Sequence, residues 1–365
     1  MLGMFAIGIP TISCMLLIIS SLMYTNNVFI RYKKIKSKLT LLPVIFGLSF
    51  FLAGISEFIA INAPSILIAI IMGSISYFSI IAGLVILLLY LEFARTSRIN
   101  REFIAVAIIL ATINVVSLCL QGISYIGEPG NYQRLFEFNL VALVSYILLF
   151  LCLIYEMLQV VSRSIEFKWL LFFAVFIFIS VSLILVELAV PLIFYKLIRS
   201  LKWEILYINL GILGFTLLFW SLSILKMPVT LLILPNEIYG ALLLTKSGFE
   251  ISKVLAEKEH EEVVSYTSTL VSGILAVNRE ISERAVSDSF MTYNAVGRDV
   301  LIYFGNFIVL VLLIKFDNMI TRDIAKSMLL YLERSTEMPT DDVISEELRE
   351  NGEKALVEII GMLRT

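Results

Sequence analysis

Histidine and cysteine are scarce in this sequence. The chain has one histidine and three cysteines, and Cys14, Cys119 and Cys152 all lie within apolar segments. A metal site needs several such ligands close together, and disulfides belong to water-exposed oxidising loops, so neither is expected. The nucleotide-binding patterns GxxxxGK[ST] and GxGxxG do not occur. With no metal, cofactor or nucleophile-base constellation, we do not expect an enzyme.

Charge is scarce as well, and it is unevenly distributed. Only 16% of the residues are charged, against about 25% in soluble proteins, and 59% are hydrophobic, with a mean hydropathy of +0.94. Residues 1–226 hold 15 Lys/Arg and 9 Glu with no Asp, whereas residues 227–365 hold 13 Lys/Arg against 21 Asp/Glu, a balance of −8. We therefore expect a membrane domain over 1–226 and a polar, acidic domain over 227–365.

Long apolar runs fill the first domain. A helix needs about 20 apolar residues to cross the hydrocarbon core of a bilayer. Seven stretches predict seven transmembrane helices, at about 2–24, 39–60, 65–91, 103–121, 138–158, 169–195 and 205–225. The odd-numbered linkers between them hold ten Lys/Arg and the even-numbered linkers hold four. The positive-inside rule then predicts a multi-pass protein of the cell membrane, with the N-terminus outside and the C-terminal domain in the cytoplasm.

One apolar run in the polar domain, NFIVLVLLIKFDN at 306–318, is too short to be an eighth span. It has eight uncharged apolar residues, Phe307–Ile314, and ends at Lys315. We interpret Val300–Phe304 and Phe307–Ile314 as two strands joined by a Gly305-Asn306 turn. A continuous apolar strand is typical of the centre of a sheet that is covered on both faces.

Further strands and helices are predicted around this hairpin. Ile238–Thr245 and Phe249–Leu255 form another hairpin around Lys246-Ser-Gly248, and Phe290–Ala295 is a further strand. Apolar residues at three- and four-residue spacing predict helices over Glu261–Arg284, from Ile320 to Leu332, and from Ile344 to Leu363. The expected fold class is an α-helical membrane bundle of seven spans followed by a C-terminal α/β domain, ββαβββαα, with an antiparallel five-stranded sheet.

The C-terminal domain resembles the longin/roadblock superfamily of small α/β modules. The matching features, over roughly 232–365, are the stretches IYGALLLTKSGFEI and LVSGILAVNREI and the order of the elements. They correspond to a hairpin with glycine in its turn, a helix with small residues and three antiparallel strands. The resemblance implies a non-enzymatic platform that dimerises and binds small GTPases or other signalling partners. It carries over no catalytic residue.

The membrane domain is similar to the seven-helix sensor regions that precede bacterial and archaeal histidine kinases. The matching pieces, within about 25–225, are GLSFFLAGISEFIA, ISYFSIIAGLVILLLYLEF and the basic RTSRINRE. This chain departs from that pattern because no kinase follows. The stretch EHEEVVS lacks the Arg and Pro of a phospho-acceptor box, and no glycine-rich ATP-binding boxes come after it. We therefore interpret His260 as a solvated residue at a helix start.

Polar residues inside the predicted spans are the candidate ligand-binding residues, because charged groups at membrane depth are costly. They are Glu57, Asn114, Glu187, Tyr207 and Asn209, all at the outer level of the bundle. One interpretation is an outward-facing pocket in which Glu57 and Glu187 bind a cationic or hydroxylated small molecule. In the other interpretation, Glu57 and Asn209 reach the headgroup region and Glu187 bonds a neighbouring helix.

The expected function is that of a receptor or sensor that signals from outside to inside through the longin/roadblock-like domain. The exposed face of the helix 261–284 and the edge strand 249–255 are the candidate surface for a small GTPase or a second copy, unless the last helix covers that edge. Two alternatives stay open: a transporter or lipid-handling protein with a regulatory domain, and a membrane anchor for a GTPase-binding platform. The lipid bilayer is an expected partner, and a nucleic acid is not.

Overall fold

The structure is a computed structural model of the whole chain. It describes residues 2–35, 39, 41–95, 100–127, 132–161, 208, 210–218, 222, 238–256, 261–277, 290–295, 298–315, 317–335 and 346–363. The chain forms two compact units. The first comprises Met1–Ile30, Leu41–Glu92 and Ile99–Lys226, and the second comprises Arg31–Thr40, Phe93–Arg98 and Met227–Thr365.

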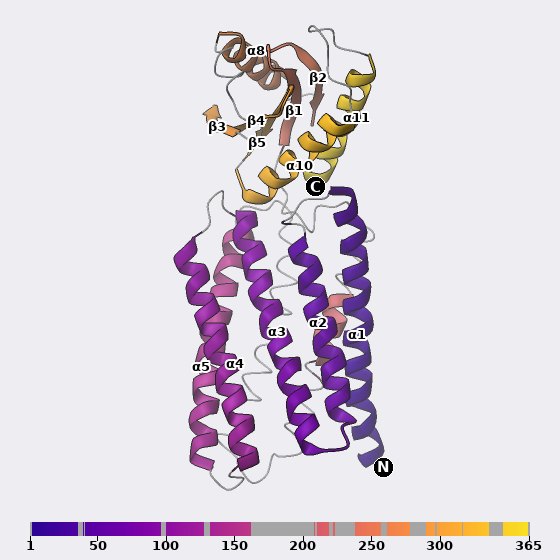
Figure 1. Cartoon of the computed structure of the whole chain (residues 1–365), viewed down its shortest axis with the longest axis vertical. Coiled ribbons are helices and arrows are strands. Elements are labelled where there is room, and N and C mark those ends of the chain that lie inside the picture. The colour runs from indigo at the N-terminus through magenta and orange to yellow at the C-terminus, as the bar shows by residue number, and fades with distance from the viewer. Residues whose placement is uncertain are drawn as a thin grey trace. The chain divides into compact units, whose positions relative to one another are not determined.

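Helices make up the described part of the first unit (Figure 1). They are α1 (Leu2–Ile35), α2 (Leu41–Ile61), α3 (Ile66–Arg95), α4 (Arg101–Gly127) and α5 (Tyr132–Val161). Each coincides with one of the first five predicted spans, but α1 does not end near residue 24 as predicted and continues to Ile35. Residues 210–218 are also helical. The predicted sixth span, 169–195, and much of the seventh lie outside the described residues.

Three helical stretches in the described part of the chain are long and apolar enough to cross a membrane: Pro10–Ile30, Leu41–Ile61 and Leu67–Phe93. The distribution of their side chains fits lipid surroundings. On α1 most of the exposed side chains are large and apolar, and they include Ile12, Met15, Ile19 and Leu22. The buried side chains of α1 include Ser13, Ser20 and Ser21. Apolar residues outside and small polar residues inside reverse the pattern of a water-soluble bundle, which indicates association with a membrane.

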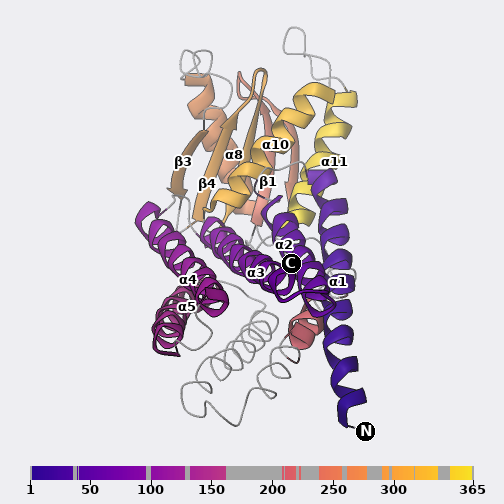
Figure 2. The ribbon, with the colours of Figure 1, turned by 60° about the horizontal axis from the view of Figure 1, so that its bottom comes forward.

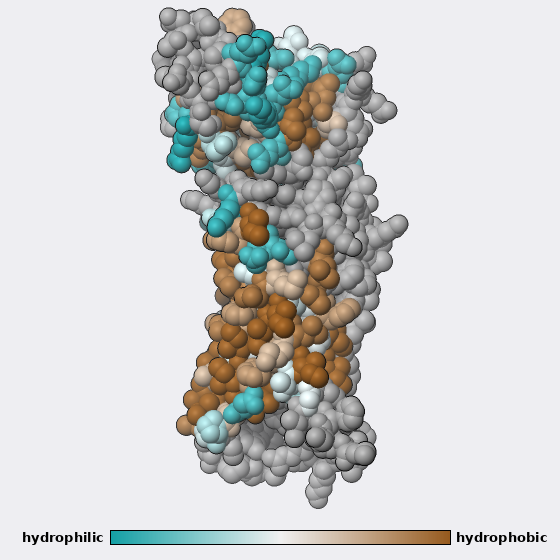
Figure 3. Space-filling model, turned by 90° about the vertical axis from the view of Figure 1, so that its right-hand side faces the viewer, coloured by the Kyte–Doolittle hydropathy of each residue, from teal (hydrophilic) through white to brown (hydrophobic). Residues whose placement is uncertain are grey.

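The same contrast is visible on the molecular surface (Figure 3). On the face drawn, brown hydrophobic residues predominate on the coloured surface of the N-terminal helices. Teal hydrophilic residues predominate on the coloured surface of the C-terminal domain, in keeping with its excess of acidic residues. The two units therefore present surfaces suited to different solvents.

Small residues allow close helix packing in the first unit. A Cβ added at Gly54 on α2 would lie 2.9 Å from Cγ1 of Ile18 on α1. A Cβ added at Gly214 would lie 2.7 Å from the backbone nitrogen of Leu17. Helix α1 therefore packs closely against both α2 and the helical segment 210–218, as is common where helices associate in lipid.

The described part of the second unit contains a five-stranded antiparallel sheet. Its strands are β1 (Ile238–Thr245), β2 (Glu250–Leu255), β3 (Phe290–Ala295), β4 (Arg298–Phe304) and β5 (Ile308–Ile314), in the order β2-β1-β5-β4-β3. The helices are α8 (Glu261–Val277), α10 (Met319–Ser335) and α11 (Glu346–Leu363). The predicted order ββαβββαα and the antiparallel sheet are confirmed. Residues 278–284 of the predicted helix 261–284 lie outside the described residues.

Helices cover both faces of this sheet, with α8 on one side and α10 and α11 on the other (Figure 2). Gly240 on β1 faces α8, since a Cβ there would lie 2.6 Å from Val264. Gly352 on α11 approaches the opposite face, where a Cβ would lie 3.0 Å from Leu243. Every residue of β5 is buried. The interpretation of this apolar run as a central strand, and not as a span, is therefore confirmed.

The turn between β4 and β5 lies one residue later than predicted. Phe304 pairs with Val309, and the Gly305 amide donates to the Ile308 carbonyl over 2.9 Å, so Asn306 and Phe307 are the central residues of the turn. The carboxylate of Glu333 on α10 fixes this register. It accepts hydrogen bonds from the Phe307 amide (3.1 Å) and the Asn306 side chain (3.0 Å). The residues of the turn could not predict this contact, because Glu333 lies on a helix that is distant in the sequence.

Candidate functional site

The carboxyl group of Glu57 is buried inside the helical unit. Glu57 lies one turn before the end of α2, and 7% of its surface is exposed. Its side chain forms a hydrogen bond with the hydroxyl of Ser76 on α3, which is itself buried. The Glu57 carboxyl therefore faces the neighbouring helices.

Helix α1 adds further polar atoms next to Glu57. Cys14 is buried and lies close enough to Glu57 for an electrostatic interaction. Its neighbour Ser13 packs against the helical segment 210–218, where a Cβ added at Gly211 would lie 2.9 Å from Ser13 Oγ. We call Ser13, Cys14, Glu57 and Ser76 the polar layer. It joins α1, α2 and α3 by small or hydrogen-bonding side chains in a unit whose outer surface is apolar.

Asn114 occupies a different place in the same unit. It lies on α4, is 1% exposed, and donates from Nδ2 to the Ala142 carbonyl on α5 over 2.7 Å. The Ser145 hydroxyl donates to the same carbonyl over 2.9 Å. The side-chain oxygen of Asn114 is buried and has no hydrogen-bond partner among the described residues. The described contacts of Asn114 thus connect α4 with α5, and none of them joins Asn114 to the polar layer.

The other three predicted site residues, Glu187, Tyr207 and Asn209, lie outside the described residues. His260 lies outside them as well. The described residue nearest in sequence to Asn209 on its C-terminal side is Leu210, followed by Gly211, which meets the polar layer at Ser13.

Two buried carboxyl residues escaped the sequence analysis. Glu92 on α3 and Glu156 on α5 are both 0% exposed. The Glu92 carboxylate accepts a hydrogen bond from the Asn100 amide over 3.2 Å, across the linker from α3 to α4. Both residues lie near the ends of predicted spans, where a glutamate is normally expected to reach water.

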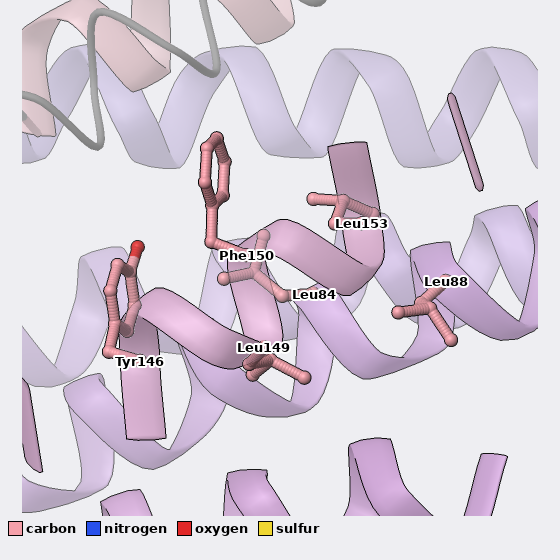
Figure 4. Close-up of a pocket in the computed structure, with 6 residues that line it drawn as sticks. All are labelled: Leu84, Leu88, Tyr146, Leu149, Phe150 and Leu153. Atoms are coloured by element: carbon pink, nitrogen blue, oxygen red, sulfur yellow. The ribbon is translucent and has the colours of Figure 1, made fainter. Parts of the chain in front are cut away.

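An apolar contact connects α3 and α5 (Figure 4). Leu84 and Leu88 on α3 face Tyr146, Leu149, Phe150 and Leu153 on α5. These side chains leave no room for a water molecule between them. The contact is therefore close packing, and it offers no preformed binding cavity.

In the second unit, α8 presents an exposed face with apolar side chains. Val264, Thr267 and Val271 are buried against the sheet. On the opposite side of the helix Tyr266 is 64% exposed and Leu270 is 38% exposed. Thr269 and Gly273 lie on the same outer side, and nothing lies within 4 Å of a Cβ added at Gly273. We call Tyr266, Thr269, Leu270 and Gly273 the α8 face.

Strand β2 forms one edge of the sheet, as predicted, and β1 is its strand partner. Its charged side chains are tied to α8: Glu250 accepts from the Ser268 hydroxyl over 2.9 Å, and Lys253 donates to Ser265 over 2.7 Å. The register between β1 and β2 also shifts at Leu243/Leu244. Charges and register shifts protect an edge strand from pairing with another chain. The α8 face is therefore the stronger candidate for a partner surface.

An ion pair and several hydrogen bonds surround the start of α10. The guanidinium of Arg322 binds both carboxylate oxygens of Asp317, and the Asp317 amide donates to Asp299 over 2.9 Å. Burial lowers the pKa of Arg322, but the hydrogen bond and charge of Asp317 outweigh this effect and the pKa is raised. Asn318 caps the helix through a 2.7 Å bond from the Thr321 amide. These contacts stabilise the junction between β5 and α10.

Comparison of this chain with protein-family models, curated proteins and solved structures finds no match in any of the three. Within the described part of the chain there is also no group of three or more His, Cys, Asp or Glu residues that could hold a metal ion.

Proposed function

We propose that the protein is a non-enzymatic membrane receptor or sensor with seven transmembrane helices. Its N-terminus lies outside the cell and its C-terminal domain lies in the cytoplasm. The observation that carries the proposal is the combination, in one chain, of a buried carboxyl group in an apolar helical unit and an α/β domain with an exposed partner surface. A small ligand taken up from outside at the polar layer is the input, and a change in partner binding at the α8 face is the output.

The membrane arrangement of this proposal rests on charge. Ten Lys/Arg in the odd-numbered linkers against four in the even-numbered linkers favour a cytoplasmic location for the odd linkers and, after seven spans, for the C-terminal domain. Glu57 and Ser76 then belong to the outer half of the bundle, within reach of a ligand that arrives from outside.

The α8 face supports a role in protein binding. Aromatic residues are enriched where proteins bind each other, and Tyr266 exposes most of its surface beside Leu270, four residues and about one turn further along the helix. The order of elements agrees with the resemblance to longin/roadblock modules. We therefore propose a small GTPase or a related signalling protein as the partner.

The test uses the full-length protein in nanodiscs and a set of small GTPases from the same cell, each loaded with GDP or a GTP analogue. We expect at least one of them to bind, and we expect Tyr266→Ala to weaken binding about tenfold or more, as truncation of an interface aromatic commonly does. Tyr331→Ala is the matched control, because Tyr331 is a tyrosine of similar exposure, 55%, on α10.

Two results would count against the output part of this proposal. One is that no small GTPase binds in either nucleotide state. The other is that Tyr266→Ala and Tyr331→Ala weaken binding equally, since this would mean that the α8 face is not the contact surface.

A transporter is the second candidate, and the three buried glutamates favour it. Glu57, Glu92 and Glu156 are ionisable residues inside an apolar helical unit, and such residues often mark ion or substrate pathways. Proteoliposomes that take up a labelled ion only when the intact protein is present, and lose uptake with Glu57→Gln, would decide for transport and against a pure sensor.

A further inference from the structure

The described surroundings of Glu57 contain neutral partners. From α3 the Ser76 hydroxyl meets its carboxyl group, and from α1 the titratable group that faces it is the Cys14 thiol. No described lysine or arginine forms an ion pair with Glu57. A hydroxyl group is an adequate partner for a neutral carboxylic acid. It provides only one hydrogen bond to a carboxylate, which has room for about four.

An ionised carboxylate in this position is costly. Glu57 is 7% exposed, and it lies among apolar helices whose outer surface also faces an apolar solvent. Burial of an unpaired charge is expensive, and a group in such a place commonly becomes neutral instead. The geometry, without any charged partner in the described contacts, therefore favours the acid form of Glu57 in the packed bundle.

We propose that the polar layer is a proton-binding site and that Glu57 is the group that holds the proton. This inference rests on the proposed function, because it identifies the chemical species that the sensor detects. In the packed state the Glu57 carboxylic acid is hydrogen-bonded to Ser76. On opening to water, the carboxyl O–H bond breaks, the proton passes to water, and the carboxylate remains on Glu57.

Close packing around the site limits what else can enter it. A Cβ at Gly54, three residues before Glu57 on α2, would meet Ile18 at 2.9 Å, and Gly211 meets Ser13 at a similar distance. A proton needs no cavity, whereas a cationic or hydroxylated molecule would have to separate these helices. The layer is thus suited to a change in acidity on the outer side of the membrane.

Infrared difference spectroscopy of the full-length protein in nanodiscs tests this inference directly. At pH 7 an exposed glutamate is ionised. We therefore expect a carbonyl stretching band of a protonated carboxyl group at pH 7, reversibly lost as the pH is raised, and missing in Glu57→Gln. We expect Ser76→Ala to shift this band, because the carboxyl group loses its hydrogen-bond partner. Glu92→Gln and Glu156→Gln are matched controls, and both variants should keep the band that we assign to Glu57.

The outcomes separate this inference from the proposed function. A parent spectrum at pH 7 without a band that depends on Glu57, or a band unchanged by Ser76→Ala, overturns the proton site and leaves the GTPase experiment as it stands. Absence of GTPase binding together with an intact Glu57 band overturns the GTPase part of the proposed function and leaves the proton site as it stands. If Glu57→Gln lowers the helical content of the protein, the shift with Ser76→Ala decides the question alone.

Discussion

Two glycines in neighbouring elements of the C-terminal domain should respond to the same substitution with opposite signs. Gly248 ends the β1–β2 turn with φ of +90°, and a Cβ there would lie 2.8 Å from the Ser272 carbonyl oxygen on α8. An L side chain in the left-handed region costs about 1–2 kcal/mol, and relief of the contact requires α8 to move. We expect Gly248→Ala to destabilise the domain by about 2 kcal/mol or more.

Gly273 is the matched control, one residue beyond Ser272 in the same helix. Nothing lies within 4 Å of a Cβ added there, so Gly273→Ala only removes the entropic cost of a helical glycine. It should stabilise the domain by about 0.5–1 kcal/mol. One variant should therefore be less stable than the parent and the other more stable, although both add one methyl group close to the same end of α8.

Hydrogen exchange of the β1 and β5 amides in the full-length protein measures this difference. These strands are buried and should exchange through unfolding of the whole domain. A loss of 2 kcal/mol corresponds to exchange about 30-fold faster. The reasoning is refuted if Gly248→Ala exchanges like the parent, or if Gly273→Ala exchanges faster than the parent.

Three further predictions concern single side chains. Burial raises the pKa of Tyr303, so its phenol stays protonated in the folded domain above about pH 10, where the same group ionises in the unfolded chain. The free energy of unfolding should therefore fall by about 1.4 kcal/mol per pH unit above about pH 10. Urea titrations of Tyr303→Phe should lack this contribution of Tyr303 to the slope. In urea titrations Arg322→Ala should lower the free energy of unfolding by about 2 kcal/mol, because it removes the ion pair to Asp317, which is only 12% exposed. Lys354→Ala is the control. It should lower the free energy of unfolding by less than about 0.5 kcal/mol, because Lys354 and its partner Glu350 are 73% and 68% exposed. Asn114→Ala should lower the stability of the helical unit against detergent unfolding by about 0.6 kcal/mol, because the hydrogen bond to the Ala142 carbonyl on α5 is lost. Thr112→Ala removes only a hydrogen bond within α4 and should lower the stability by less.

Much of the C-terminal fold could be predicted from short stretches. A glycine turn between two apolar runs and a switch from strand to helix periodicity locate β1, β2 and α8 without any long-range information. The position of the β4–β5 turn could not be predicted in this way, because Glu333, 26 residues after Phe307, sets it by hydrogen bonding. The strand order is also a long-range property, since it places β1 beside β5 and not beside β3.

The candidate site in the helical unit was less accessible to sequence reasoning. Length and hydropathy located the helices, but they do not say which side of a helix faces its neighbours. Glu57 and Asn114 were both predicted as candidate ligand-binding residues at the outer level of the bundle, and their described partners, Ser76 and Ala142, lie on different helices. Glu92 and Glu156 were missed because burial near a helix end depends on how neighbouring helices approach, which the hydropathy of one segment does not contain.

The position of β1 in the sheet has a consequence for synthesis on the ribosome. β1 leaves the ribosome after the helical unit, yet Ala241 pairs with Leu312 on β5, about 70 residues later in the chain. At about 5–20 residues per second, the completely buried side chains of β1 wait roughly 4–14 s for that partner. During this interval the hydrophobic β1–β2 hairpin lacks its central strand partner. Chaperones that shield nascent chains would have their clearest task on this protein between residues 245 and 314.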